Sequence, residues 1–130
     1  MTYVPDTHAL VWFLANDPRL GRRAGMVFQE AAAQFAVPTL VLCEMHYLAE
    51  RERIARDMAK ILDYMRGDDR FALIPLDENV IRHLPGGLDI HDGIIVATAL
   101  AVGMARKTKS ILVTRDADIR RAGLVETIWE

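Results

Sequence analysis

Four acidic residues, Asp6, Glu44, Asp92 and Asp116, lie far apart in the chain, yet each adjoins an apolar segment. If these segments are the strands of one sheet and the helices that pack on it, the four carboxylates meet at one end of the sheet. Two like charges about 4 Å apart cost roughly 4 kcal/mol at an effective dielectric near 20. A carboxylate cluster therefore persists where protons or cations neutralise it. An all-oxygen set of this kind suits Mg²⁺ or Mn²⁺.

Other polar residues stand beside these acids. Thr7 and Thr114 either complete turn hydrogen bonds or contact a metal-bound water. Arg115 precedes Asp116 and is the best candidate for a contact with a substrate phosphate. The histidines near the acids do not form a His/Cys set with zinc spacing. They are His8, His46 and His91.

Simpler roles compete with metal binding at several positions. Asp6 is also a favoured helix N-cap, and a cap and a ligand can be the same residue. Asp89 is the better pure cap of the helix that carries Asp92 in its first turn. Glu44 lies in an apolar helix, where a buried carboxylate is costly unless paired. Three further residues are predicted to serve packing, with the two tryptophans as core or interface anchors: Trp12, Trp129 and Cys43.

Apolar periodicity and turn residues predict strands that alternate with helices. Pro5 and Pro38 are expected to end their strands, because proline cannot donate to a sheet ladder. The alternation predicts a mainly parallel sheet with helices on both faces and a site beyond the carboxyl ends of the strands. The predicted strands are 2–4, 34–37, 71–74, 110–114 and 125–129. The predicted helices are 7–14, 21–33, 40–51, 52–66, 77–84, 90–104 and 117–122.

The composition of the 130 residues predicts a single domain, 1–130, with 52% hydrophobic residues for its core. The net charge of -2 argues against a dedicated nucleic-acid coat protein. It does not exclude an enzyme that acts on nucleic acid through a metal. A single cysteine excludes an internal disulfide. No apolar stretch is long enough for a bilayer, so we expect a cytoplasmic protein with no membrane association.

Several motifs together resemble the PIN-domain family, in particular VapC-like toxin ribonucleases of type II toxin–antitoxin systems. The resemblance covers nearly the whole chain. It rests on Asp6-Thr7-His8-Ala9-Leu10-Val11-Trp12, Asp17-Pro18-Arg19-Leu20, Glu44 in its apolar helix, His91-Asp92-Gly93-Ile94-Ile95-Val96-Ala97-Thr98-Ala99 and Thr114-Arg115-Asp116. Gly93 departs from the family, in which a basic residue commonly follows this aspartate.

The resemblance implies a three-layer α/β/α sandwich with a five-stranded parallel sheet. It implies an endoribonuclease that depends on Mg²⁺ or Mn²⁺ and hydrolyses RNA. Asp6, Glu44, Asp92 and Asp116 would be its catalytic acids and metal ligands, with Thr114 as a polar helper. It also implies a homodimer that a small antitoxin protein neutralises. The apolar content of residues 21–66 independently predicts a partner surface there.

Three alternatives make different demands on the sequence. A catalytically weak PIN-like module that binds RNA or protein would lack some of the four acids, and all four are present. A phosphate-accepting receiver domain needs an aspartate at the end of a central strand and a later lysine, and residues 71–74 lead instead into Pro75. A phosphatase with a nucleophilic aspartate usually carries Asp-x-Asp, where this chain has Asp6-Thr7-His8.

Overall fold

The computed structural model describes residues 1–52 and 57–130, and its strands all run in the same direction. The sheet order is β3-β2-β1-β4-β5, and each neighbouring pair is parallel. The strands are β1 (Thr2–Pro5), β2 (Gln34–Pro38), β3 (Phe71–Ile74), β4 (Ser110–Val113) and β5 (Glu126–Ile128). The predicted parallel sheet is confirmed. Pro5 and Pro38 are the last residues of their strands, as predicted.

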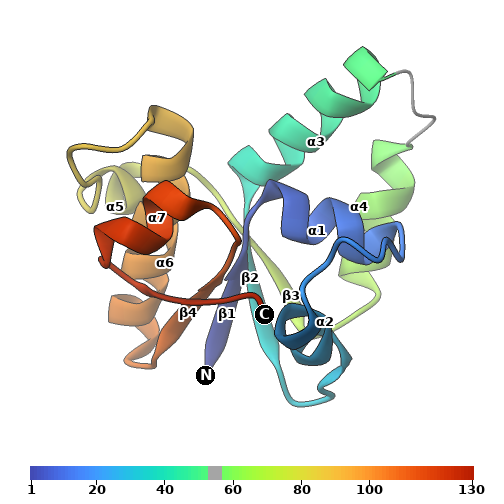
Figure 1. The fold of residues 1–130 in the computed structure, drawn as a ribbon, viewed down its shortest axis with the longest axis horizontal. Helices are drawn as coiled ribbons and strands as arrows, with labels where there is room; N and C mark the ends of the chain where they lie inside the picture. The colour runs from blue at the N-terminus through green and yellow to red at the C-terminus, as the bar shows by residue number, and fades with distance from the viewer. Residues whose placement is uncertain (53–56) are drawn as a thin grey trace.

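The helices cover both faces of this sheet. Right-handed crossovers place the connections from β1 to β3 on one face and those from β3 to β5 on the other. Figure 1 shows α1, α2 and α4 on one side of the sheet and α5, α6 and α7 on the other. The helices are α1 (Thr7–Leu14), α2 (Arg22–Gln29), α3 (Thr39–Glu52), α4 (Met58–Arg66), α5 (Glu78–Ile81), α6 (Ile90–Arg106) and α7 (Ala117–Ala122).

Helix α3 has a special place in this arrangement. It rises beyond the carboxyl ends of the strands (Figure 1) and contacts both α1 and α6. Helix α6 begins at the same edge and runs back along the sheet. The carboxyl edge is therefore surrounded by the starts of helices that come from both layers. None of the helices in residues 1–52 and 57–130 combines the length and apolarity that crossing a bilayer requires.

Alternate strand residues build the core on the two faces of the sheet. Val4 and Leu112 pack in one cluster with apolar residues of α6, and both are fully buried. Phe35 packs in the other cluster, which includes Trp12 and Trp129. Both tryptophans are thus core residues, as predicted. Cys43, predicted to pack in the core, is instead exposed, because the outer face of α3 carries it away from the sheet.

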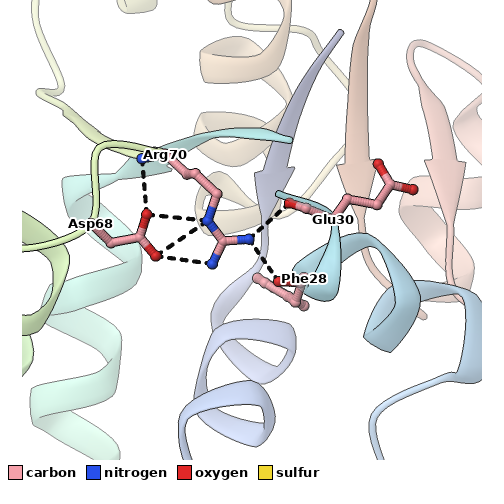
Figure 2. A network of polar contacts seen from close by, with 4 residues as sticks. All are labelled: Phe28, Glu30, Asp68 and Arg70. Carbon is pink, nitrogen blue, oxygen red and sulfur yellow. Dashed lines mark hydrogen bonds and ion pairs between the residues drawn. The ribbon is translucent and has the colours of Figure 1, made fainter. Parts of the chain in front are cut away.

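Arg70 joins the end of α2 to the start of β3 (Figure 2). Its guanidinium donates hydrogen bonds to the Asp68 carboxylate and to the backbone carbonyls of Phe28 and Glu30, at 2.8 and 2.9 Å for the two carbonyls. These side-chain hydrogen bonds hold the pKa of Asp68 below its ordinary value. The guanidinium also lies over the rings of Phe35 and Phe71. Arg70 therefore satisfies the Phe28 carbonyl, which the end of α2 leaves without a helical partner, and adds a second donor to the Glu30 carbonyl, which also accepts from the Ala33 N–H.

Some predicted helix boundaries are wrong. The helix predicted over 21–33 is α2, which ends at Gln29, because Glu30 is extended and the chain turns there toward β2. The helix predicted over 77–84 ends at Ile81. Asp77 caps it as predicted, with its side chain accepting from the Val80 N–H. Of the helix predicted over 52–66, residues 53–56 lie outside the described residues, and α4 starts at Met58.

Candidate active site

Asp6 and Asp116 come to the same edge of the sheet because β1 and β4 are neighbours, with Pro5 paired to Val113. Asp6 follows β1, and its backbone N–H donates to the Val113 carbonyl at 3.1 Å. Its Oδ1 caps α1 by accepting from the Ala9 N–H at 2.9 Å. Asp116 caps α7 in the same way, with its Oδ1 accepting from the Ile119 N–H at 2.9 Å. Both aspartates are therefore oriented by helix caps.

Thr114 links these two aspartates and is fully buried. Its hydroxyl donates to Asp6 Oδ2 at 2.5 Å and accepts from the Asp116 N–H at 3.0 Å. One hydroxyl therefore fixes the position of both residues. The geometry matches the turn-bonding role considered for Thr114 and places it directly behind the acidic residues.

Glu44 and Asp92 lie on two helices, α3 and α6, that approach the carboxyl edge from opposite sides of the sheet. Glu44 lies on α3, and its Oε1 accepts a hydrogen bond from the Thr7 hydroxyl of α1 at 3.1 Å. Thr7 is buried, so this contact holds the glutamate against the start of α1. Asp92 lies in the first turn of α6, where the helix dipole favours a negative charge. Asp89 caps that helix, as predicted, by accepting from the His91 N–H.

The four carboxylates line one pocket of about 460 Å³, here called the acidic pocket. All the predicted site residues except Thr114 line it, and Thr114 lies behind Asp6. Tyr47 and Leu48 also contribute to the wall and were missed by sequence reasoning. The helical spacing of three and four residues from Glu44 is the signal that would have found them. The lining consists of Asp6, Thr7, His8, Glu44, Tyr47, Leu48, Asp92, Ile95, Arg115 and Asp116.

Mutual repulsion and burial change the acidity of this pocket. Burial, and after it the negative charges of Asp116, Asp89, Glu44 and Asp6, together raise the pKa of Asp92 to about 6. Burial also raises the pKa of Asp6, against the hydrogen bonds from Thr114 and Ala9 that favour its charged form. These raised pKa values indicate that the charged forms of Asp6 and Asp92 are energetically unfavourable in this pocket. A bound cation would stabilise them.

The oxygen donors suit a hard divalent cation, but they do not form a finished metal cage. Within residues 1–52 and 57–130, no three acidic, histidine or cysteine side chains are grouped closely enough to hold a metal ion as they stand. Asp6 accepts hydrogen bonds at both carboxylate oxygens, and Glu44 and Asp116 each accept one at a single oxygen, so each of these three side chains is held in one orientation. Cation binding would therefore require some of these side chains to rotate toward one another.

Arg115 is the positive group of the acidic pocket. It is exposed, and its guanidinium lies 4.5 Å from the centre of the Trp12 ring. This contact combines cation–π attraction with restriction of the long side chain. Arg115 is therefore held beside the carboxylates without an ion pair to Asp116 among the described residues. Its charge remains available to an anionic ligand.

Comparison with known proteins identifies the fold. The chain aligns end to end with VapBC2 from Rickettsia felis, solved bound to a promoter DNA fragment, with 17% identity over 100% of both chains and a TM-score of 0.72. A DNA-bound VapBC from Salmonella typhimurium covers 98% of this chain and 97% of its own, with 16% identity and a TM-score of 0.67.

VapC20 of Mycobacterium tuberculosis, described as a sarcin-ricin loop cleaving toxin, covers 99% of this chain and 100% of its own, with 19% identity and a TM-score of 0.62. No curated protein sequence matches the chain. The family model that matches is the PIN domain, over residues 3–124. Since this match covers nearly the whole sequence, the chain belongs to the PIN domain family.

Proposed function

We propose that this protein is a divalent-metal-dependent endoribonuclease and the toxin of a toxin–antitoxin pair. The observation that carries the proposal is the acidic pocket, in which four carboxylates from separate elements converge at the carboxyl edge of a parallel sheet. Membership of the PIN domain family supports a nuclease. Among the structural relatives, a sarcin-ricin loop cleaving toxin supports RNA as the substrate, and the VapBC structures and a toxin–antitoxin complex from Klebsiella pneumoniae support an antitoxin as the partner.

Asp6, Glu44, Asp92 and Asp116 would hold Mg²⁺ or Mn²⁺, because carboxylate oxygens are the ligands these ions prefer. When bound, such an ion supplies Lewis-acid chemistry: it lowers the pKa of a water and neutralises charge on phosphoryl oxygens. No histidine, cysteine or serine nucleophile is needed for this hydrolysis.

The chain's own residues then have distinct roles. Thr114 holds Asp6, and Thr7 holds Glu44, each through a hydroxyl that donates to a carboxylate oxygen. Because these hydrogen bonds already hold Asp6 and Glu44 at the pocket, only a small rotation of the carboxylates would be needed before they bind a cation. Arg115 stands at the rim of the same pocket and would bind a phosphate of the RNA backbone with its planar set of donors. Positioning and charge neutralisation are thus divided between different side chains.

A pair of variants on one helix end tests this function. Asp92→Asn keeps the size of the side chain but removes its charge, and it should reduce cleavage of total bacterial RNA by at least about a hundredfold. Asp89→Asn is the matched control, since Asp89 caps the same helix outside the acidic pocket. It should cut RNA as the unchanged protein does. Denaturing gels measure cleavage, and circular dichroism checks that both variants are folded.

Metal dependence is measured in the same assay. EDTA should stop cleavage by the unchanged protein, and an excess of Mg²⁺ or Mn²⁺ should restore it. Full activity in EDTA, or equal activity of Asp92→Asn and the control, would contradict the proposed site. RNA binding without any cleavage would favour the alternative of a catalytically weak RNA-binding module.

A further inference from the structure

The acidic pocket continues into two neighbouring surface pockets. The first, of about 410 Å³, shares His8, Leu48 and Arg115 with the acidic pocket and has Trp12 in its wall. We call it the tryptophan pocket. The second, of about 540 Å³, shares Arg19 and Arg115 with the tryptophan pocket, and we call it the arginine pocket. Arg115 lines all three, so the pockets form one path across the surface.

The charge changes sign along this path. The acidic pocket is lined by four carboxylates and Arg115. In the described part of the chain, the arginine pocket is lined by Arg19, Arg22, Arg115 and Arg120, with Glu130 as its acidic residue. Among residues 1–52 and 57–130, neither Arg22 nor Arg120 forms an ion pair, and both are exposed. These two residues come from different elements, α2 and α7, and line the same recess.

The middle of the path is built to hold its arginines in place. The guanidiniums of Arg115 and Arg19 lie 4.5 and 4.8 Å from the centre of the Trp12 ring. The ring itself is only 4% exposed and packs edge-on against Trp129, so it cannot serve as an open platform for a base. Arg19 is further fixed by hydrogen bonds to the Asp17 carboxylate, which hold the pKa of Asp17 at about 2. Trp12 is thus a positioning residue for the two guanidiniums.

We propose that this path binds a single-stranded RNA segment that flanks the scissile bond, with its backbone phosphates held by Arg115 and by the arginine pocket. The inference rests on the proposed ribonuclease function. When the scissile phosphate lies in the acidic pocket, the rest of the RNA strand must continue out of that pocket. Arg115 lines both the acidic pocket and the arginine pocket, so it marks the direction in which the strand can run. Backbone contacts by arginine are the main source of affinity in such complexes. Small recesses that follow one another along a single path suit one strand better than a duplex.

The test uses two double variants with the same loss of charge. Arg22→Gln with Arg120→Gln removes two guanidiniums from the arginine pocket. Arg106→Gln with Lys107→Gln is the control, because these residues end α6, whose 17 residues place them about 25 Å from its start beside the acidic pocket. Both pairs are made in an Asp92→Asn background, which slows cleavage under the proposed function. The probe is a fluorescein-labelled, mixed-sequence, single-stranded RNA of about 16 nucleotides.

Fluorescence anisotropy at several salt concentrations between about 50 and 200 mM gives the dissociation constant and its salt dependence. The arginine-pocket pair should weaken RNA binding roughly tenfold and reduce the salt slope by about 0.7 for each lost phosphate contact. The control pair should leave the slope unchanged. Equal slopes for the two pairs would overturn the proposed path. A polyglutamate of similar length should compete poorly, and equal competition would overturn the RNA assignment in favour of an acidic protein segment.

Failure of the proposed RNA path can be distinguished from failure of the ribonuclease proposal. The ribonuclease proposal fails if Asp92→Asn cuts RNA like the unchanged protein, which gels of the same samples reveal. The path fails if cleavage depends on Asp92 while binding is indifferent to Arg22 and Arg120. Trp12 is left unchanged in both pairs, because its burial means that substitution would also perturb the core.

Discussion

Single side chains at the carboxyl edge have both a structural and a proposed chemical role. Asp6 and Asp116 each use Oδ1 to cap a helix. The cap fixes each carboxylate and directs it to the edge where helices of both layers begin. Because capping and ligand binding use different lone pairs of the same carboxylate, a residue identified correctly as an N-cap is not thereby excluded from the site. Asp92 differs, since Asp89 caps its helix.

At the residue scale, we expect Asp92 to make stability fall as pH rises. The unfolded side chain has the ordinary aspartate pKa near 4, and the folded one has a pKa of about 6. Between these values the folded state keeps a proton that the unfolded state has lost. The stability this group contributes is therefore complete below about pH 4 and is lost as pH rises through about 6. Asp92→Asn should remove this fall.

Urea unfolding in EDTA at about pH 4, 5 and 7 measures the effect. At pH 7, Asp92→Asn should be more stable than the unchanged protein by about 1 kcal/mol, a figure reduced for the partial exposure of the side chain. Asp89→Asn should keep most of the pH dependence, since it leaves the half-buried Asp92 carboxyl in place. A loss of stability in Asp92→Asn at pH 7 would show that Asp92 is charged and stabilised rather than destabilised by its neighbours.

At the scale of elements, one guanidinium joins segments that lie some 40 residues apart. Arg70 directly precedes β3, and its guanidinium donates hydrogen bonds to the carbonyls at the end of α2. Its side chain is 20% exposed and that of Asp68 is 25% exposed, so the pair is shielded from solvent on most sides. The aromatic rings of Phe13, Phe28, Phe35 and Phe71 stack beside it. The polar clamp and this stack together hold α2 against the sheet edge.

We expect Arg70→Ala to lower the free energy of unfolding by about 2 kcal/mol, because it removes the guanidinium partner of the partly buried Asp68 carboxylate and the donor to the Phe28 carbonyl. Arg82→Ala is the control. Arg82 also pairs with a carboxylate, Glu78, but both side chains are at least 70% exposed. Such a pair contributes below about 0.5 kcal/mol. Chemical denaturation measures both variants, and similar losses for the two would contradict the clamp.

At the scale of the whole molecule, the predicted partner surface divides into two sets of residues. Phe28, Met45 and Met65 are buried in the core, as packing on the sheet requires for part of this apolar region, and so do not belong to a partner surface. Tyr47 and Tyr64 are 57% and 46% exposed. Met26 is exposed as well, and Ile54 lies outside the described residues. Tyr47 also lines the acidic pocket. A partner that covers Tyr47 would therefore also cover the proposed catalytic carboxylates.

We expect expression of this chain alone to slow the growth of a bacterial host, and co-expression of the adjacent small reading frame to restore it. Tyr47→Ser should abolish that rescue, since loss of a central interface aromatic commonly costs about 2 kcal/mol or more, roughly a thirtyfold loss of affinity. Met104→Ser is the control, because Met104 is 73% exposed near the far end of α6. Colony growth and co-purification provide the two measurements. Harmless expression of the soluble, unchanged chain would contradict the toxin role.

Local rules account for what could be predicted from the sequence. Asp77 and Asp89 could be identified as caps because an N-cap carboxylate accepts a hydrogen bond from a backbone N–H only two or three residues further along the chain. The alternation of strands and helices predicted the parallel sheet, and with it the shared edge for Asp6 and Asp116, since parallel strands end on the same side. The resemblance carried by the spaced motifs led to the family. Each of these inferences depends on neighbours in sequence or on a general rule of topology.

Tertiary packing decided the rest, because the contacts involved join segments whose approach depends on helix tilt and register. The outward face of α3 exposes Cys43, while the same helix turns Glu44, Tyr47 and Leu48 toward the acidic pocket. Arg115 meets the Trp12 ring across about a hundred residues of sequence. Such contacts form only after the core has oriented the elements. The sequence by itself thus determined the chemistry available, and the packing of α1, α3, α6 and α7 determined which residues share the site.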